Sequence, residues 1–265
     1  AGERRGIAVP PLLLYFSLDL TPRVLLSSVE IGLECGFDGF VLGNTSRDRP
    51  SSLVTGSETI RRVGRGGLSG APLLARVLER LAAVRQAMGS GPTLIGVGGL
   101  LEVPDAGRMI DAGADVFVGH GPHALRGIEI YEGKPIFYSL GDFIFQNETL
   151  LRLPEENYQA YALEANQHVA DFNDRRYDGG TRGFPATPEI WESVVAMPTF
   201  RGGELVSIKL HPISLQFGSP AWVRGRPLLA NEELSKKILD DLIRVSAPFG
   251  TTIQNDDGTG VVVLR

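Results

Sequence analysis

The stretch GADVFVGHGPHALRGIEIYEGKPIFYSLGDF, residues 113–143, lies where the pattern of the chain changes. Its short apolar run, 116–118, predicts a buried strand, and a Gly-Pro loop that holds His120 and His123 follows directly. The alternating segment after the loop turns at Glu132-Gly133-Lys134, which predicts an antiparallel hairpin. Two imidazoles on one loop can bind a metal ion, but such an ion needs further ligands.

Residues before this stretch alternate between strand and helix patterns. Apolar runs predict strands at 12–16, 40–42, 93–99 and 114–119. Helical spacing of apolar residues predicts helices at 22–36, 72–89 and 104–113, the first of them capped by Thr21 and ended by Gly36. This βαβα order predicts a parallel sheet, either open or closed into a barrel.

The chain after the hairpin follows another pattern. Residues 153–189 are rich in loops with short helices, and a second hairpin is expected about Arg201-Gly202-Gly203. An amphipathic helix follows, capped by Asn231 and ended near Gly250, and a third hairpin with an Asp-Gly turn closes the sequence. The second half is therefore expected to be rich in antiparallel strands.

Composition excludes several classes of function. The 265 residues carry a net charge of −5, and no Lys/Arg run is longer than a pair, so we expect no nucleic-acid partner. Cys35 is the single cysteine, which excludes an intrachain disulfide and a cysteine-based zinc cluster; we expect a buried, inert thiol. No apolar segment of about 18 residues is present, so we expect no membrane segment and, for the chain as given, a cytoplasmic protein. A small-molecule or polymer substrate is expected, and the sequence leaves the oligomeric state open.

Four segments resemble one enzyme family. PLLLYFSLDL, GFDGFVLGNTSRDRP, GGLSGAPL and LIGVGGL stand in the order found in the C-terminal part of dihydroorotate dehydrogenase, a flavin enzyme with a (βα)₈ barrel. The resemblance implies that Asn44 and Thr45 face the orotate, that Gly70 contacts the flavin, and that Gly98 and Gly99 bind the FMN phosphate. Turn chemistry alone is the alternative explanation for these glycines.

The sequence departs from that family at two places. Tyr15 stands where the family has a lysine that contacts the flavin, and GHGPH replaces the last phosphate loop. The sequence also holds no counterpart of the earlier barrel strands. An FMN-dependent oxidoreductase is therefore the alternative function.

Residues 111–265 resemble the C-terminal part of the CapA-like proteins of capsule and poly-γ-glutamate synthesis, a family with a calcineurin-like metallophosphatase fold. The resemblance implies that His120 and His123 bind Mn, Fe or Zn in a hydrolase site. The chain's other histidines, His168 and His211, are isolated, so we expect only a partial site. A loop whose imidazoles bond nearby carbonyls is the alternative.

The two resemblances meet near Asp111 to Val116. The predicted fold class is α/β, with parallel βα units, as in part of a TIM barrel, at 1–114 and an antiparallel-rich metallophosphatase half at 115–265. Asp142 and Glu129 either support the metal ligands or are structural residues at strand ends, and the structural explanation is favoured. No Ser-His-Asp triad is nominated, because no Gly-x-Ser-x-Gly elbow occurs, and no catalytic residue is named. We expect a chimera of two incomplete parents that is inactive as it stands.

Overall fold

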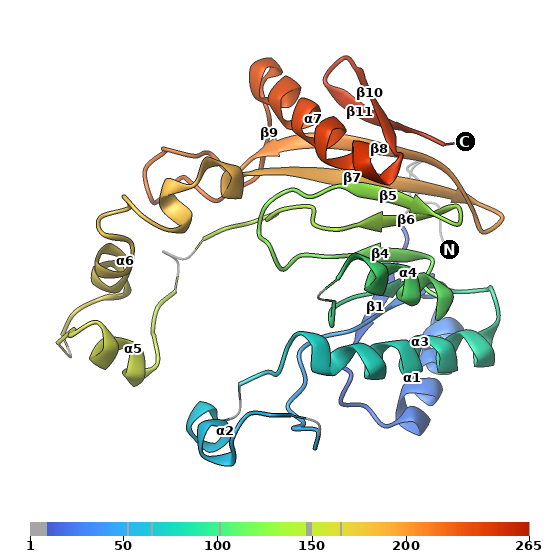
Figure 1. Ribbon diagram of the computed structural model, residues 1–265, viewed down its shortest axis with the longest axis horizontal. Coiled ribbons are helices and arrows are strands. Elements are labelled where there is room, and N and C mark those ends of the chain that lie inside the picture. The colour runs from blue at the N-terminus through green and yellow to red at the C-terminus, as the bar shows by residue number, and fades with distance from the viewer. Residues whose placement is uncertain are drawn as a thin grey trace. The chain divides into compact units, whose positions relative to one another are not determined.

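The computed structural model describes residues 10–51, 53–64, 66–100, 102–146, 150–164 and 166–264 (Figure 1). The chain forms two compact units. The first contains the residues up to Gly119 together with Ile130–Tyr138 and Gly202–Glu204, and the second contains His120–Glu129, Ser139–Arg201 and the residues from Leu205 onward. The boundary expected between 114 and 115 stays a prediction, and the first nine residues of the expected N-terminal part lie outside the described ranges.

A parallel sheet forms the centre of the first unit. Its first four strands are adjacent in chain order: β1 (Leu13–Phe16), β2 (Gly39–Leu42), β3 (Thr93–Gly96) and β4 (Val116–Val118). The helices are α1 (Pro22–Glu34), α2 (Ser57–Val63), α3 (Leu74–Met88) and α4 (Val103–Asp111), with a 3₁₀ turn, η1 (Ala71–Leu73), before α3. The predicted parallel βα order is confirmed.

Residues next to the helix ends determine where these helices begin and end. The Thr21 hydroxyl accepts the Val24 N–H at the start of α1, and Gly36 follows the end of α1 with φ 85°, as predicted. Helices α1, α3 and α4 pack in that order against the sheet (Figure 1), and their apolar residues form one core with Phe40, Leu94 and other strand residues. Because these helices pack on the sheet, the strands and the loops that follow their carboxyl ends are held in place.

The hairpin after the histidine loop extends this sheet. It consists of β5 (Ile128–Tyr131) and β6 (Lys134–Phe137), and the strand order of the six-stranded sheet is β1-β2-β3-β4-β6-β5. Strand β6 runs parallel to β4, with Phe117 opposite Ile136. The hairpin predicted about residues 132–134 is present, and β6 also pairs in parallel with β4, which the expectation of antiparallel hairpins in the second half did not include. Residues 135–137 of β6 are all buried, as is typical of a strand inside a parallel sheet.

An ion-pair network joins the two sides of the expected junction within the first unit. The carboxylate of Asp115 lies 2.6 Å from the Arg85 guanidinium of α3 and 3.4 Å from the Lys134 ammonium of β6. The same carboxylate accepts the Leu94 N–H of β3 at 2.9 Å. Segments on the two sides of the expected junction therefore share one set of charged contacts.

The second unit contains an antiparallel sheet. Its strands are β7 (Glu192–Arg201), β8 (Glu204–Ser214), β9 (Leu228–Leu229), β10 (Thr252–Asp256) and β11 (Thr259–Val263), in the order β10-β11-β8-β7 with β9 beside β8. Helix α7 (Glu232–Ser246) begins at Asn231, whose side chain accepts the Leu234 N–H, as predicted. The shorter helices are α5 (Glu155–Ala160), α6 (Val169–Tyr177), η3 (Phe184–Ala186), η4 (Pro188–Trp191) and η5 (Ala247–Phe249).

The predicted fold class is confirmed at the level of a mixed α/β chain with one parallel and one antiparallel sheet. Helix α2 was not expected, since its seven residues, SETIRRV, carry no long apolar repeat. The expectation that Cys35 is buried is wrong, because this residue is exposed. It caps α1 beyond the buried face formed by Leu25, Val29 and Gly32.

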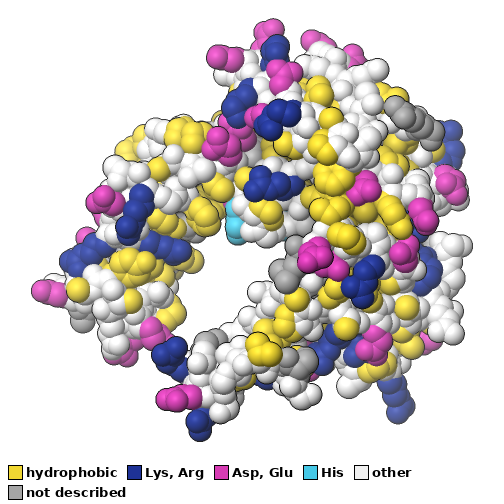
Figure 2. All heavy atoms as spheres, in the orientation of Figure 1, with side chains coloured by type: hydrophobic (Ala, Val, Ile, Leu, Met, Phe, Trp, Pro, Cys, Tyr) yellow, Lys and Arg dark blue, Asp and Glu magenta, His cyan; other side chains and the backbone are white. Residues whose placement is uncertain are grey.

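Charges of both signs are interspersed on the face of the molecule shown in Figure 2. On α7, Lys236 pairs with Asp240 and Lys237 pairs with Asp241. Such alternation gives no single-sign surface there. Among the described residues, no helix is both long enough and apolar enough to cross a membrane.

Asp19 ties the loop after β1 to the loop after β2. Its carboxylate accepts the Ser46 hydroxyl at 2.5 Å and the Arg47 N–H at 3.0 Å, and the Arg76 guanidinium lies 3.6 Å away. Burial acts to raise the pKa of Asp19. The two hydrogen bonds and the charges of Arg76 and Arg47 outweigh it and hold this pKa below its ordinary value of 3.8.

We expect Asp19 to make stability depend on pH. Because its pKa is lowered in the folded chain, its stabilisation is present above pH 3.8 and is lost as the pH falls through 3.8 and lower. Denaturant unfolding at neutral pH and at about pH 3 measures the effect. The wild type should lose more free energy of unfolding on acidification than Asp19→Asn, and equal losses would contradict the assignment.

Candidate metal centre

The histidine loop begins at the carboxyl end of β4. The His123 N–H donates to the His120 carbonyl at 3.2 Å, which closes a tight turn over Gly121 and Pro122. His123 has φ 55°, in the left-handed region that few residues other than glycine adopt. The turn brings the two rings to a centroid separation of 5.5 Å at an interplanar angle of 85°.

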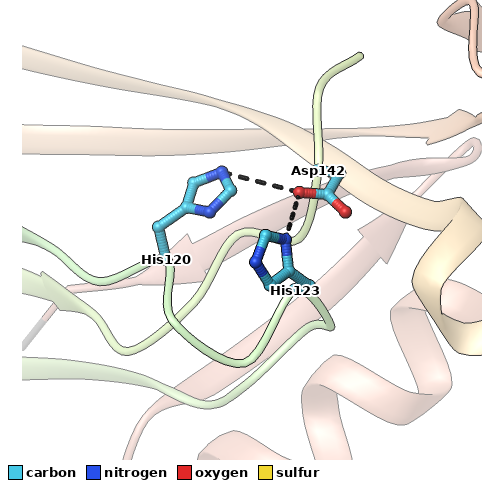
Figure 3. A group of neighbouring side chains, drawn as sticks. All are labelled: His120, His123 and Asp142. Carbon is cyan, nitrogen blue, oxygen red and sulfur yellow. Dashed lines mark hydrogen bonds and ion pairs between the residues drawn. The ribbon is translucent and has the colours of Figure 1, made fainter. Parts of the chain in front are cut away.

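Asp142 completes a group of three side chains. Its Oδ1 lies 2.9 Å from His123 Nδ1 and 3.9 Å from His120 Nε2, so both rings face one carboxylate oxygen (Figure 3). Its side chain is 5% exposed, against 55% for His120 and 41% for His123. The sequence interpretation favoured a structural role for Asp142 over one beside the metal ligands, and it did not anticipate that this carboxylate meets both imidazoles.

The donor set fits a divalent transition metal. The three ligand atoms lie within 4.8 Å of one another. Two ligand atoms that each lie about 2 Å from one tetrahedral ion are roughly 3.3 Å apart. This value falls between the 2.9 Å from Asp142 Oδ1 to His123 Nδ1 and the 3.9 Å from the same oxygen to His120 Nε2. The second oxygen of Asp142, Oδ2, is buried and has no hydrogen-bond partner among the described residues. An uncompensated buried carboxylate oxygen is costly, and a bound cation would relieve that cost.

Aromatic side chains support the group from one side. The ring of Phe184 lies 5.5 Å from that of His123, and Phe145 contacts both Phe184 and Trp191. The Trp191 indole N–H donates to the Phe184 carbonyl at 3.0 Å. This small apolar cluster, centred on the buried Trp191, contacts the His123 ring through Phe184.

Other residues considered from the sequence lie outside the group. His168 begins α6, where its backbone N–H donates to Asp171, and His211 lies in β8 beside a shallow depression that also contains Glu232 and Asp257. Glu129 lies in β5. Among the described residues, His120, His123 and Asp142 form the one set of three potential metal ligands.

The residues expected to face an orotate lie in the loop after β2. Asn44 and Thr45 are exposed, and the Asn44 side-chain oxygen accepts the Thr45 N–H at 2.7 Å. The loop approaches Gly67 so closely that a Cβ there would lie 2.3 Å from the Thr45 hydroxyl oxygen. The Asn44 oxygen is thus engaged within its own loop.

The glycines expected to contact a flavin have positive φ angles. Gly98 and Gly99 follow β3 with φ 86° and 83°, and Gly70 precedes η1 with φ 83°. A Cβ at Gly99 would lie 2.8 Å from the Leu74 nitrogen, so packing alone requires glycine there. Tyr15, at the position of the family's lysine, is 53% exposed on the edge strand β1 and offers no positive charge.

The candidate site is thus a His-His-Asp group in a mixed α/β protein. The family model of the bacterial capsule synthesis protein PGA_cap matches residues 105–147, which include all three side chains. Two uncharacterized proteins of Sinorhizobium fredii, y4sH and y4uA, are each 40% identical to the chain over 170 residues, covering 60% of this chain and 36% of theirs.

The comparisons also find the resemblance to dihydroorotate dehydrogenase. The dihydroorotate dehydrogenase (quinone) of a Nocardioides species is 37% identical over 117 residues, covering 44% of this chain and 33% of that protein. A crystal structure of dihydroorotate dehydrogenase from Eimeria tenella in complex with ferulenol is 31% identical, covers 41% of this chain and 28% of that one, and has a TM-score of 0.37. Both sequence resemblances are confirmed, and the chain spans about a third of the length of these curated relatives.

Proposed function

We propose that this chain binds a divalent metal ion, Mn, Fe or Zn, through His120, His123 and Asp142, as a CapA-like protein of capsule or poly-γ-glutamate synthesis. The observation that carries the proposal is the convergence of two imidazole nitrogens on one buried carboxylate oxygen, inside the segment that the capsule synthesis family model matches. Neutral imidazole and carboxylate are ligands that suit these metals.

Each residue has a distinct part in this proposal. Asp142 supplies the negative charge from a buried position. Its Oδ1 lies 2.9 Å from His123 Nδ1 in the metal-free chain, and a bound ion would take the place of the proton between these two atoms. His120 is the most exposed of the three and leaves the site open on its side. Three protein ligands with an open position are typical of catalytic rather than structural zinc sites.

A bound ion would supply polarisation of a phosphoryl oxygen and an activated water, the chemistry of metal-assisted phosphoester hydrolysis. A two-metal site takes more ligands than the three grouped in the described part of the chain. We therefore propose a partial phosphoesterase-type site that binds metal and has little or no hydrolytic activity by itself.

Metal titration of the purified chain tests the proposal. We expect one Zn²⁺ or Mn²⁺ ion per chain by calorimetry, and an affinity on the order of tenfold lower in His120→Ala. His168→Ala is the control, because His168 lies at the start of α6 outside the group, and it should bind as the wild type does. A wild type that binds no ion, or an unchanged affinity in His120→Ala, would contradict the proposed ligands.

A second candidate function is an FMN-dependent oxidoreductase of the dihydroorotate dehydrogenase type. The observation that favours it is the 37% identity over 117 residues to that enzyme. Asn44 and Thr45 would then face the substrate, and Gly98 and Gly99 the phosphate. The neutral Tyr15 does not fit a flavin site that relies on a cation. Visible flavin absorbance in the purified protein would support this candidate.

We also propose that the two resemblances divide the chain, the dehydrogenase-like part at 1–114 and the CapA-like part at 115–265, joined near Asp111 to Val116. Continuity of β3, β4 and β6 in one sheet supports a join that preserves local structure. A single sequencing read of the source DNA across these codons tests whether one reading frame encodes both parts.

A further inference from the structure

The three proposed ligands lie on two segments that contact each other. His120 and His123 belong to the loop after β4, and Asp142 belongs to the segment after β6. Leu125 and Leu140 form an antiparallel bridge between the segments. The Arg126 N–H donates to the Ser139 carbonyl at 3.0 Å beside that bridge. The position of Leu140 therefore governs how the carboxylate meets the imidazoles.

Ser193, at the start of β7, holds Leu140. Its hydroxyl donates to the Leu140 carbonyl at 2.5 Å, and its residue is 2% exposed. The Val194 N–H reaches the same carbonyl at 3.5 Å, a much longer contact. Because hydrogen bonds weaken with distance, the Ser193 hydroxyl is the main partner of this carbonyl.

Gly141 transmits this constraint to Asp142. Its φ of 77° lies in the left-handed region, and a Cβ there would lie 2.9 Å from the Glu192 carbonyl oxygen and 3.2 Å from the Ser193 hydroxyl oxygen. The backbone thus passes against β7 with no space for a side chain. The Gly141 N–H also donates to the Ser139 hydroxyl at 3.3 Å. One residue later the Asp142 side chain leaves this fixed backbone.

We infer that Ser193 is a positioning residue for the metal centre: its hydroxyl fixes the Leu140 carbonyl and thereby the carboxylate of Asp142. The inference rests on the proposed metal-binding function. Ligand sites depend on such supporting contacts, since a carboxylate free to rotate away from its partners loses affinity for the ion.

Variants at Ser193 test this role by metal affinity and by the visible spectrum of bound Co²⁺, which reports ligand geometry. We expect Ser193→Ala to lower Zn²⁺ affinity by on the order of tenfold and to change the Co²⁺ spectrum. Ser193→Thr keeps the hydroxyl and should restore both. Ser235→Ala is the matched control: Ser235 is 6% exposed and its hydroxyl also donates to a backbone carbonyl, that of Ala230.

The outcomes separate this inference from the function on which it rests. Wild-type affinity and an unchanged Co²⁺ spectrum in Ser193→Ala would overturn the role of Ser193 and leave the metal centre intact. A wild type that binds neither ion would overturn both. If Ser193→Ala does not fold, Ser193→Cys fills the same space with a weak donor, and wild-type affinity in that variant would overturn the role equally.

Discussion

Asp142→Asn should lower the affinity of the chain for Zn²⁺ or Mn²⁺ by at least about 100-fold, because it removes the one charged ligand of the group. The change preserves shape and leaves both imidazoles in place, so the loss isolates the contribution of the carboxylate. One oxygen of this buried carboxylate has no hydrogen-bond partner among the residues that the structure describes, so removing the charge should not destabilise the metal-free chain. Metal affinity and stability should therefore respond differently.

Calorimetric titration and thermal unfolding with and without metal measure the two effects. At a free metal concentration 100 times the dissociation constant, binding should stabilise the wild type by about 2.7 kcal/mol and Asp142→Asn hardly at all. Asp174→Asn, a change at an exposed carboxylate of α6, serves as the control and should behave as the wild type. Equal metal stabilisation of Asp142→Asn and the wild type would remove Asp142 from the site.

The second large effect is expected for Asp115→Ala, which should lower the free energy of unfolding by about 2 kcal/mol. The variant leaves Arg85, Lys134 and the Leu94 N–H without their shared acceptor. Breaking a fully buried pair costs more, but these side chains are 21–32% exposed and solvent screens part of the interaction. The lower free energy of unfolding should be seen in the transition in which the parallel sheet unfolds.

Denaturant unfolding followed by circular dichroism measures this loss, and thermal unfolding should show a fall in Tm of roughly 4–8 °C. Asp240→Asn removes an exposed pair with Lys236 and should change stability by less than about 0.5 kcal/mol. If Asp115→Ala were as stable as this control, the ion pairs of Asp115 would not stabilise the packing of β3, β4 and β6 against one another.

Features that depend on neighbouring residues were predictable. Thr21 and Asn231 cap their helices, and the Asp257-Gly258 turn joins β10 to β11, because each depends on residues only a few positions apart. Helix α2 was missed because SETIRRV lacks an extended apolar repeat. The loop with its two histidines was also predictable, because a tight turn brings side chains three residues apart close together.

Features that depend on contacts between residues far apart in the sequence could not be predicted. The parallel pairing of β6 with β4 requires the histidine loop to reverse the chain in a particular way, and alternating hydrophobicity cannot distinguish that arrangement from a simple hairpin. Asp142 lies 19 residues beyond His123. Its position in SLGDF, after a glycine at the end of an apolar strand, was the available signal, and it fits a structural residue as well as a ligand.

The sequence by itself determined the order of strands and helices, the change of pattern near residue 115, the two family resemblances and the pair of imidazoles. Only the tertiary structure decided that Asp142 meets His120 and His123, and that Ser193 holds the segment from which Asp142 projects. Local propensities arise between neighbours along the chain, whereas these contacts depend on loop closure and on the burial of β6 and β7, which involve residues far apart in sequence.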